Sequence, residues 1–117
     1  METTKSEDLY LRTIYDLSLK MEYVKSADIA RTLDYSRASV LCLLRKLEEK
    51  GLVEFGDKKR VLLTKEGYSL ASTLSNRHKV LVDAFENIGA SHELAEKEAH
   101  QIESSISNEM LNVIDSL

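Results

Sequence analysis

The stretch from Ser26 to Gly51 constrains the fold most, because it reads as two helices joined by a sharp break. Ser26 is predicted to cap the first helix, and the dipeptide Asp34-Tyr35 interrupts the apolar pattern. Ser36 is predicted to cap a second helix, whose apolar residues recur at helical spacing: Val40, Leu43, Leu44 and Leu47. Gly51 is the expected stop. A short helix, a tight turn and a longer helix are typical of a helix-turn-helix.

A predicted β-hairpin follows directly. Residues 52–55 alternate like a strand, residues 56–60 form a turn with three cations, and residues 61–63 are a second apolar run. A hairpin after the second helix predicts a winged helix-turn-helix. The fold class is therefore mainly α with a small β-hairpin wing. The alternative is a generic helical hairpin packed on a small sheet.

Charge is distributed unevenly along the 117 residues, whose net charge is −4. Residues 1–63 carry 12 basic and 11 acidic side chains, whereas residues 64–117 carry 4 and 9. The positive charge is concentrated between residues 36 and 60, where phosphates would lie in a winged helix. We expect residues 1–63 to form the DNA-binding domain, with double-stranded DNA as partner.

The second half is predicted to be a helical dimerisation domain over residues 64–117. A long helix is expected over about 64–88, with Gly67 tolerated near its start, followed by helices over about 92–105 and 108–117. The last two are amphipathic but too poor in large apolar residues to bury themselves. They are expected to pack across a two-fold axis, which makes a homodimer.

The sequence also indicates the cellular compartment. No segment approaches the roughly 18 apolar residues of a membrane span, and the N-terminus lacks the apolar core of a signal peptide. A single cysteine, Cys42, excludes an intramolecular disulfide. We expect a cytoplasmic protein without a membrane partner.

The candidate DNA-binding residues lie on the second helix and the wing. Residues near the start of that helix can reach base edges or phosphates, whereas those farther along and at the wing tip are better placed for the backbone. These candidates are Ser36, Arg37, Ser39, Arg45, Lys46, Lys58, Lys59 and Arg60. Leu41 and Cys42 lie off the core stripe, so each can face the groove or be buried. The alternative for the whole set is a solvated charged face.

Imidazoles and carboxylates recur in the acidic half. His92, Glu96, His100 and Glu103 follow at spacings of 4, 4 and 3, which places them along one helix face. His78 lies on the preceding helix, within reach if the two helices are antiparallel. Such nitrogen and oxygen ligands on facing helices suit Mn, Fe, Zn or Co. The alternative is that these residues only cover a solvated surface.

The chain resembles the metal-dependent repressors of the diphtheria toxin repressor and manganese transport regulator family, in its compact form without an SH3-like domain. The similar segments cover most of the chain: Leu9 to Leu17, Ser26 to Ala30, Ser39-Val40, Leu44 to Val53, Leu63 to Gly67, Arg77-His78, Ile88-Gly89, and Glu98 to Glu103 followed by Ser107. The resemblance implies a homodimeric transcription factor, a repressor, with divalent Mn or Fe as corepressor.

The resemblance also implies a metal-ligand set. His78 matches the family's His on the long helix and Glu103 its Glu, while His100 and Glu96 stand at ligand positions occupied there by other residue types. The sequence departs from the family at four positions: Leu9 and Arg12 on the first helix, Val82, and Ser104 after the Glu. Asp8, one residue from the lost first-helix ligand, is a tentative substitute.

Three interpretations follow. The leading one is a metal-responsive DNA-binding regulator. The second is a divergent member that binds DNA independently of metal because its site has decayed. The third is a winged-helix protein-interaction module, which the net charge slightly favours. An enzyme is not predicted, because the sequence offers no nucleophile, phosphate loop or complementary set of acid and base groups.

Overall fold

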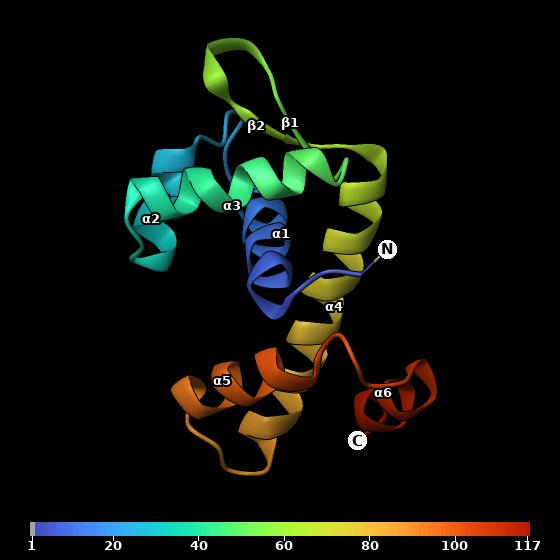
Figure 1. Cartoon of the computed structure of the whole chain (residues 1–117). Helices are drawn as coiled ribbons and strands as arrows, with labels where there is room; N and C mark the ends of the chain where they lie inside the picture. Colours follow the sequence, from blue (N-terminus) through green and yellow to red (C-terminus); the bar gives the residue numbers. More distant parts are fainter. Residues whose placement is uncertain (1) are drawn as a thin grey trace. The chain divides into compact units, whose positions relative to one another are not determined.

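The computed structural model describes residues 2–117, which divide into two compact units, the first ending at Ser72 and the second beginning at Thr73. The helices are α1 (Lys5–Ser18), α2 (Ser26–Leu33), α3 (Arg37–Glu49), α4 (Lys65–Asn87), α5 (His92–Ile102) and α6 (Asn108–Asp115). Two short strands, β1 (Val53–Phe55) and β2 (Val61–Leu63), lie between α3 and α4 (Figure 1). The mainly helical fold class with a hairpin wing is confirmed.

The first unit is a winged helix-turn-helix. β1 and β2 are antiparallel with Glu54 opposite Leu62, and the N–H of Val61 also donates to the carbonyl of Val24, so the connector after α1 lies along the hairpin. The core is apolar and close-packed, with side chains from the helices and strands of the unit: Leu11, Ile14, Ile29, Val40, Leu44, Leu47, Leu52, Val53 and Val61.

The break between α2 and α3 comes from one residue. Asp34 ends α2 in the left-handed conformation, with φ 58° and ψ 44°, which short polar side chains tolerate. Ser36 then caps α3, since its Oγ accepts from the N–H of Ser39 at 3.1 Å. At the far end Gly51 has φ +75°, as a C′ stop requires. The helix–break–helix predicted for this stretch is therefore present.

Two expected boundaries are wrong. Ser26 is inside α2 rather than its cap: Lys25 is the N-cap residue, and its N–H donates to Oδ2 of Asp28, half of a capping box. The helix expected over 92–105 ends at Ile102, because the chain turns there towards α6. At the wing tip, residues Asp57–Lys59 form a single 3₁₀ turn, η1, in which Lys58 and Lys59 have positive φ.

Gly67 is required at its position rather than merely tolerated. A Cβ there would lie 1.9 Å from the carbonyl oxygen of Leu52. The start of α4 is held against that same segment, since Thr64 donates from its N–H to Leu52 and from its hydroxyl to Gly51. Only a residue without a side chain permits this approach.

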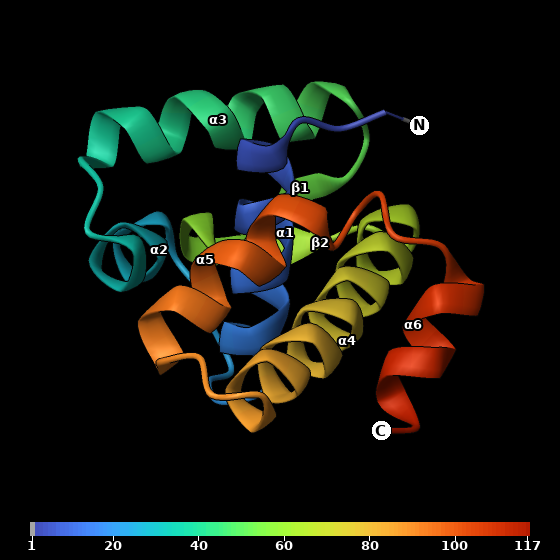
Figure 2. The same ribbon diagram turned by 90° about the horizontal axis from the view of Figure 1, so that it is seen from below.

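In the second unit, α5 and α6 pack on the second half of α4 (Figure 2). Small and branched residues form the shared core: Leu81, Val82, Ala95, Ala99 and Leu111. Ser91 and Ser107 cap α5 and α6, accepting from the N–H groups of Leu94 and Met110. None of the helices in residues 2–117 combines the length and the apolar character needed to cross a lipid bilayer.

Candidate nucleic-acid interface and metal centre

The exposed face of α3 and the wing enclose a groove of about 340 Å³ in the first unit. Its lining combines basic, apolar and polar side chains: Ser26, Arg37, Leu41, Arg45, Phe55 and Lys59. Arg37, Leu41 and Arg45 follow one another at intervals of four residues, so they form one stripe on α3. Three positive charges from two elements therefore converge on one concave surface.

Two arginines stack on aromatic rings: Arg45, which lines the groove, and Arg60 at the end of the wing turn. The guanidinium of Arg45 lies 4.8 Å from the ring centroid of Phe55 on β1 and donates to Glu48 at 3.1 Å. Arg60 lies 4.9 Å from the ring of Tyr23. Stacked guanidinium groups lose less rotamer freedom when they meet a phosphate, because they are already oriented.

The other predicted DNA-binding side chains differ in whether they already form hydrogen bonds within the protein. Arg37, Lys46, Lys58 and Lys59 are exposed. Ser36 and Ser39 are exposed too, but their hydroxyl groups hydrogen-bond each other at 2.8 Å as part of the α3 cap. Leu41 and Cys42, whose place the sequence left open, are both exposed on α3. The aromatic residue Phe55 was missed, because its contact depends on how the wing folds back.

The imidazole of His78 on α4 lies between two carboxylates of the second unit. Nδ1 is 2.6 Å from Oε1 of Glu103, and Nε2 contacts Oε2 of Glu96. Nδ1 of His100 lies 3.9 Å from Oε2 of Glu103. The structure thus brings together His78, Glu96, His100 and Glu103.

Glu103 is the most buried member of this cluster, with 1% of its side chain exposed, whereas Glu96 is 45% exposed. A buried carboxylate is unfavourable unless it is paired, and the imidazole of His78, 2.6 Å away, is one partner of Glu103. His92 lies at the edge of the cluster: its side chain is 70% exposed, with Nδ1 3.3 Å from Oε1 of Glu86 and Nε2 3.8 Å from Oε1 of Glu96. Asp8, the tentative ligand, lies in the first unit, buried and bonded by the hydroxyl of Thr3.

The donor types of the cluster fit a divalent transition metal. Two imidazoles and two carboxylates match the preferences of Mn, Fe, Zn and Co, and a ligating histidine commonly donates its second N–H to a carboxylate. Within residues 2–117, however, no three His, Cys, Asp or Glu side chains lie close enough together, as placed in this structure, to hold a metal ion. Binding would therefore require one His78–carboxylate contact to open.

Arg77 beside His78 is a further polar residue of this site. Its guanidinium donates to the carbonyl of Glu103 at 3.0 Å and to Oδ1 of Asn108 at 2.6 Å. Sequence reasoning noted Arg77 only as part of a motif, since its partners lie 26 and 31 residues away in the chain.

Comparison with known families gives two matches. The family described as "Iron dependent repressor, N-terminal DNA binding domain" matches residues 2–61. The one described as "Iron dependent repressor, metal binding and dimerisation domain" matches residues 64–117.

Individual relatives agree with these matches. The transcriptional regulator MntR of Escherichia coli O6:H1 is 31% identical over 105 residues, 90% of this chain and 68% of the relative. The MntR of Oceanobacillus iheyensis is 28% identical over 117 residues, which are all of this chain and 79% of the relative.

Solved structures share the fold. The manganese regulator SloR superposes with a TM-score of 0.78 at 28% identity, over 99% of this chain and 54% of its own. A manganese-dependent transcriptional repressor in complex with manganese gives 0.78 at 27% identity, over 94% and 51%. The chain thus spans about half the length of these solved relatives.

Proposed function

Because the chain belongs to the iron dependent repressor family, we propose that it is a homodimeric DNA-binding transcriptional regulator, a repressor that responds to Mn- or Fe-type divalent metal. It acts in the cytoplasm as a regulator rather than as an enzyme. Residues 1–63 bind double-stranded DNA, and residues 64–117 dimerise and hold metal. The observation that carries the proposal is the cationic groove between α3 and the wing.

DNA binding rests on the convergence of Arg37, Arg45 and Lys59 in this groove. A protein that neutralises phosphates releases counterions, so the logarithm of its affinity falls steeply with the logarithm of salt concentration. The exposed start of α3 enters the major groove of the duplex, while the wing lysines lie along the backbone. Leu41, on the same stripe, is the apolar contact available to a base methyl group.

Duplex binding to an upstream promoter fragment over a range of salt concentrations tests this step. The double variant Lys58→Gln, Lys59→Gln is expected to weaken binding and to lower the salt slope by about 0.9 for each phosphate that the protein no longer neutralises. Lys20→Gln is the matched control, because Lys20 is also an exposed lysine but lies just after α1. Equal slopes for all three proteins would argue against the assigned interface and for a protein-interaction module.

Metal binding rests on the cluster around His78. The proposed ligands are His78, His100, Glu103 and Glu96. The ion would supply positive charge that joins α4 to α5. All four ligands come from the second unit, whereas Asp8 lies in the first and stays a tentative prediction from the sequence.

Isothermal titration with Mn(II) and Co(II) tests the ligand set. His78→Ala and Glu103→Gln are expected to weaken binding by more than the roughly 10–100-fold that an outer hydrogen-bond partner costs. Glu98→Gln is the matched control, because Glu98 lies on the same helix as His100 but is exposed and outside the set. Unchanged affinity in His78→Ala would exclude this site.

One observation favours a second candidate, DNA binding that is independent of metal. Both ring nitrogens of His78 already contact carboxylates, so the imidazole is satisfied by hydrogen bonds alone. These contacts join α4 to α5 without a metal ion, so no metal is needed to order the cluster. Tight duplex binding in the presence of a chelator would support this candidate.

A further inference from the structure

The side of α3 that lines the groove alternates in chemistry along its length. Arg37, Leu41 and Arg45 follow one another at intervals of four residues, so an exposed apolar side chain lies between two cations. Phosphates match the cations but offer nothing to a leucine. The apolar group that a duplex presents in its major groove is the methyl group of thymine, at a base edge. The stripe therefore contains a position suited to a base as well as positions suited to charge.

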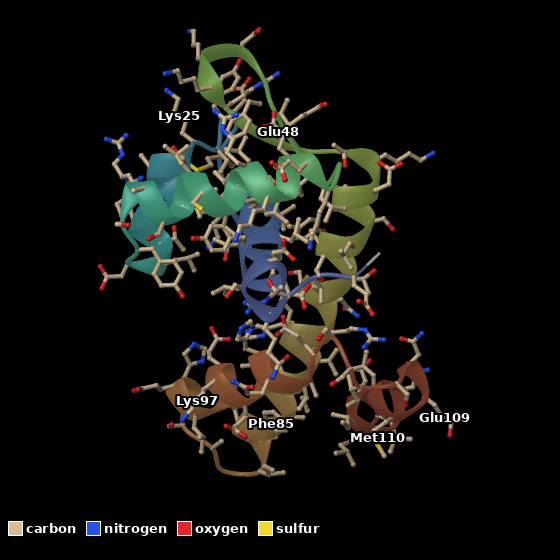
Figure 3. The ribbon with its side chains drawn as sticks, in the orientation of Figure 1. Lys25, Glu48, Phe85, Lys97, Glu109 and Met110 are labelled. Atoms are coloured by element: carbon tan, nitrogen blue, oxygen red, sulfur yellow. The ribbon has the colours of Figure 1, made fainter. Side chains whose placement is uncertain are left out.

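The protein itself holds the second cation of this stripe in place. The guanidinium of Arg45 lies 4.8 Å from the ring centroid of Phe55 and donates to Glu48, which is labelled on α3 in Figure 3. Arg45 also lies in the C-terminal half of α3, whereas the N-terminal residues of a recognition helix contact base edges. A guanidinium held in this way suits a phosphate, which fixes position and carries no sequence information.

Arg37, at the other end of the stripe, differs from Arg45 in both respects. It is exposed and is the first residue of α3. The first turn of α3 contains no acidic residue, whereas the first turns of α1, α2, α4, α5 and α6 each contain at least one. A cation at a helix N-terminus is unfavourable for the helix itself. The charge of Arg37 therefore points to a partner outside the chain, and a guanidinium can pair with O6 and N7 of guanine through two hydrogen bonds.

The serines beside Arg37 fix the backbone from which it projects. Oγ of Ser36 accepts from the N–H of Ser39 at 3.1 Å, and the two hydroxyl groups hydrogen-bond each other at 2.8 Å. These bonds cap α3 and order its first turn. The long side chain of Arg37 is therefore presented from a fixed backbone.

The spacing of Arg37 and Leu41 limits how far apart their bases can lie. Four residues of an α-helix rise by about 6 Å, and successive base pairs are about 3.4 Å apart along a strand. The two bases therefore lie at most about two base pairs apart.

We propose that Arg37 and Leu41 are the specificity-determining residues of the DNA interface. Arg37 recognises a guanine, Leu41 contacts the methyl group of a thymine at most about two base pairs away, and Arg45 binds a flanking phosphate. The inference rests on the proposed DNA-binding function and names the base pattern that this function selects.

Selection from a pool of duplexes with a randomised centre, by the full chain in the presence of Mn(II), tests this pattern. We expect enrichment of duplexes with a guanine and a thymine at the predicted spacing. In an enriched duplex, 7-deazaguanine lacks the N7 acceptor of that guanine and should weaken wild-type binding by about 10-fold. Uracil lacks the methyl group of the thymine and should weaken it by about 4-fold.

Variants of the protein connect each base to one side chain. Arg37→Ala is expected to bind the guanine and 7-deazaguanine duplexes equally, and Leu41→Ala to bind the thymine and uracil duplexes equally. Lys46→Gln removes another exposed cation of α3 and is the matched control. It should weaken binding to all of these duplexes alike and preserve both differences, because a phosphate contact does not depend on the base.

The measurements on the wild type need no substitution in the protein, so they remain valid if a variant does not fold. Duplex binding that neither base analogue changes would overturn this inference and leave the proposed function intact. A wild-type difference that persists in Arg37→Ala or in Leu41→Ala would overturn the assignment of that side chain. If the wild type bound no duplex with Mn(II) or with a chelator, the proposed function would be overturned together with the inference.

Discussion

At the scale of single residues, the metal cluster shows what spacing can predict and what it cannot. The intervals between Glu96, His100 and Glu103 placed them on one face of a helix, and in the structure both carboxylates contact His78 while His100 lies near Glu103. The spacing did not indicate that Glu103 would be fully buried, because its burial depends on packing between helices. It also did not indicate the role of Arg77, whose partners include main-chain carbonyls.

Glu7 gives a prediction about pH. Burial raises the pKa of Glu7, but the hydrogen bond from Lys50 and the bond from the Thr4 N–H outweigh it, so the pKa lies below its ordinary 4.5. A carboxyl with a lowered pKa in the folded state contributes stability above its unfolded pKa and loses it as pH falls through the folded value. The contribution of Glu7 is therefore complete near neutral pH.

We expect Glu7→Gln to lower the free energy of unfolding by about 1–2 kcal/mol at pH 7, because the charge-assisted bond to Lys50 is removed. The difference from the wild type should shrink as pH falls below about 4.5. Urea unfolding at several pH values measures it, with exposed Glu22→Gln as the control. A difference that stays constant down to pH 3 would contradict the ion pair.

At the scale of elements, caps and stops were predictable, whereas contacts between elements were not. Ser36, Gly51, Ser91 and Ser107 end or begin helices as their residue types indicate. The packing of Arg45 on Phe55 depends on the angle between α3 and the wing, which no local pattern encodes. The need for glycine at position 67 was equally unpredictable, because the carbonyl that would collide with a side chain there belongs to Leu52, 15 residues earlier in the chain.

Gly67→Ala tests the close approach of α4 to the segment before β1. Alanine favours helix more than glycine does, by about 1 kcal/mol, so propensity alone predicts stabilisation. The Cβ would instead collide with the Leu52 carbonyl, and we expect a decrease in stability of about 2–3 kcal/mol, as overpacking costs. Glu66→Ala, at an exposed position in the same turn, is the control. Thermal unfolding that is unchanged or raised in Gly67→Ala would contradict the close approach.

At the scale of the molecule, the two halves have different chemistry. The first unit has its positive charge around a groove, and the second is acidic with exposed apolar residues on α5 and α6, among them Leu94, Met110 and Val113. The difference in charge can be counted along the sequence. It could not predict the quaternary arrangement, because an exposed apolar face does not define the geometry of its partner.

Val113→Asp tests the assembly. A charge at the centre of the proposed α6 interface is unfavourable without a partner, so we expect the dimer to dissociate at least about 10-fold more readily. Sedimentation velocity measures the dimer dissociation constant, and Glu109→Gln on the same helix is the control. A dimer of wild-type strength in Val113→Asp would place the interface elsewhere.

The most direct test of a metal-responsive regulator is duplex affinity for an upstream promoter fragment with a chelator and then with Mn(II), in the wild type and in His78→Ala. We predict that Mn(II) strengthens wild-type binding and leaves His78→Ala at the chelator level. Wild-type affinity that is the same with and without metal, across Mn(II), Fe(II), Co(II) and Zn(II), would contradict the metal response and indicate a metal-independent DNA-binding protein.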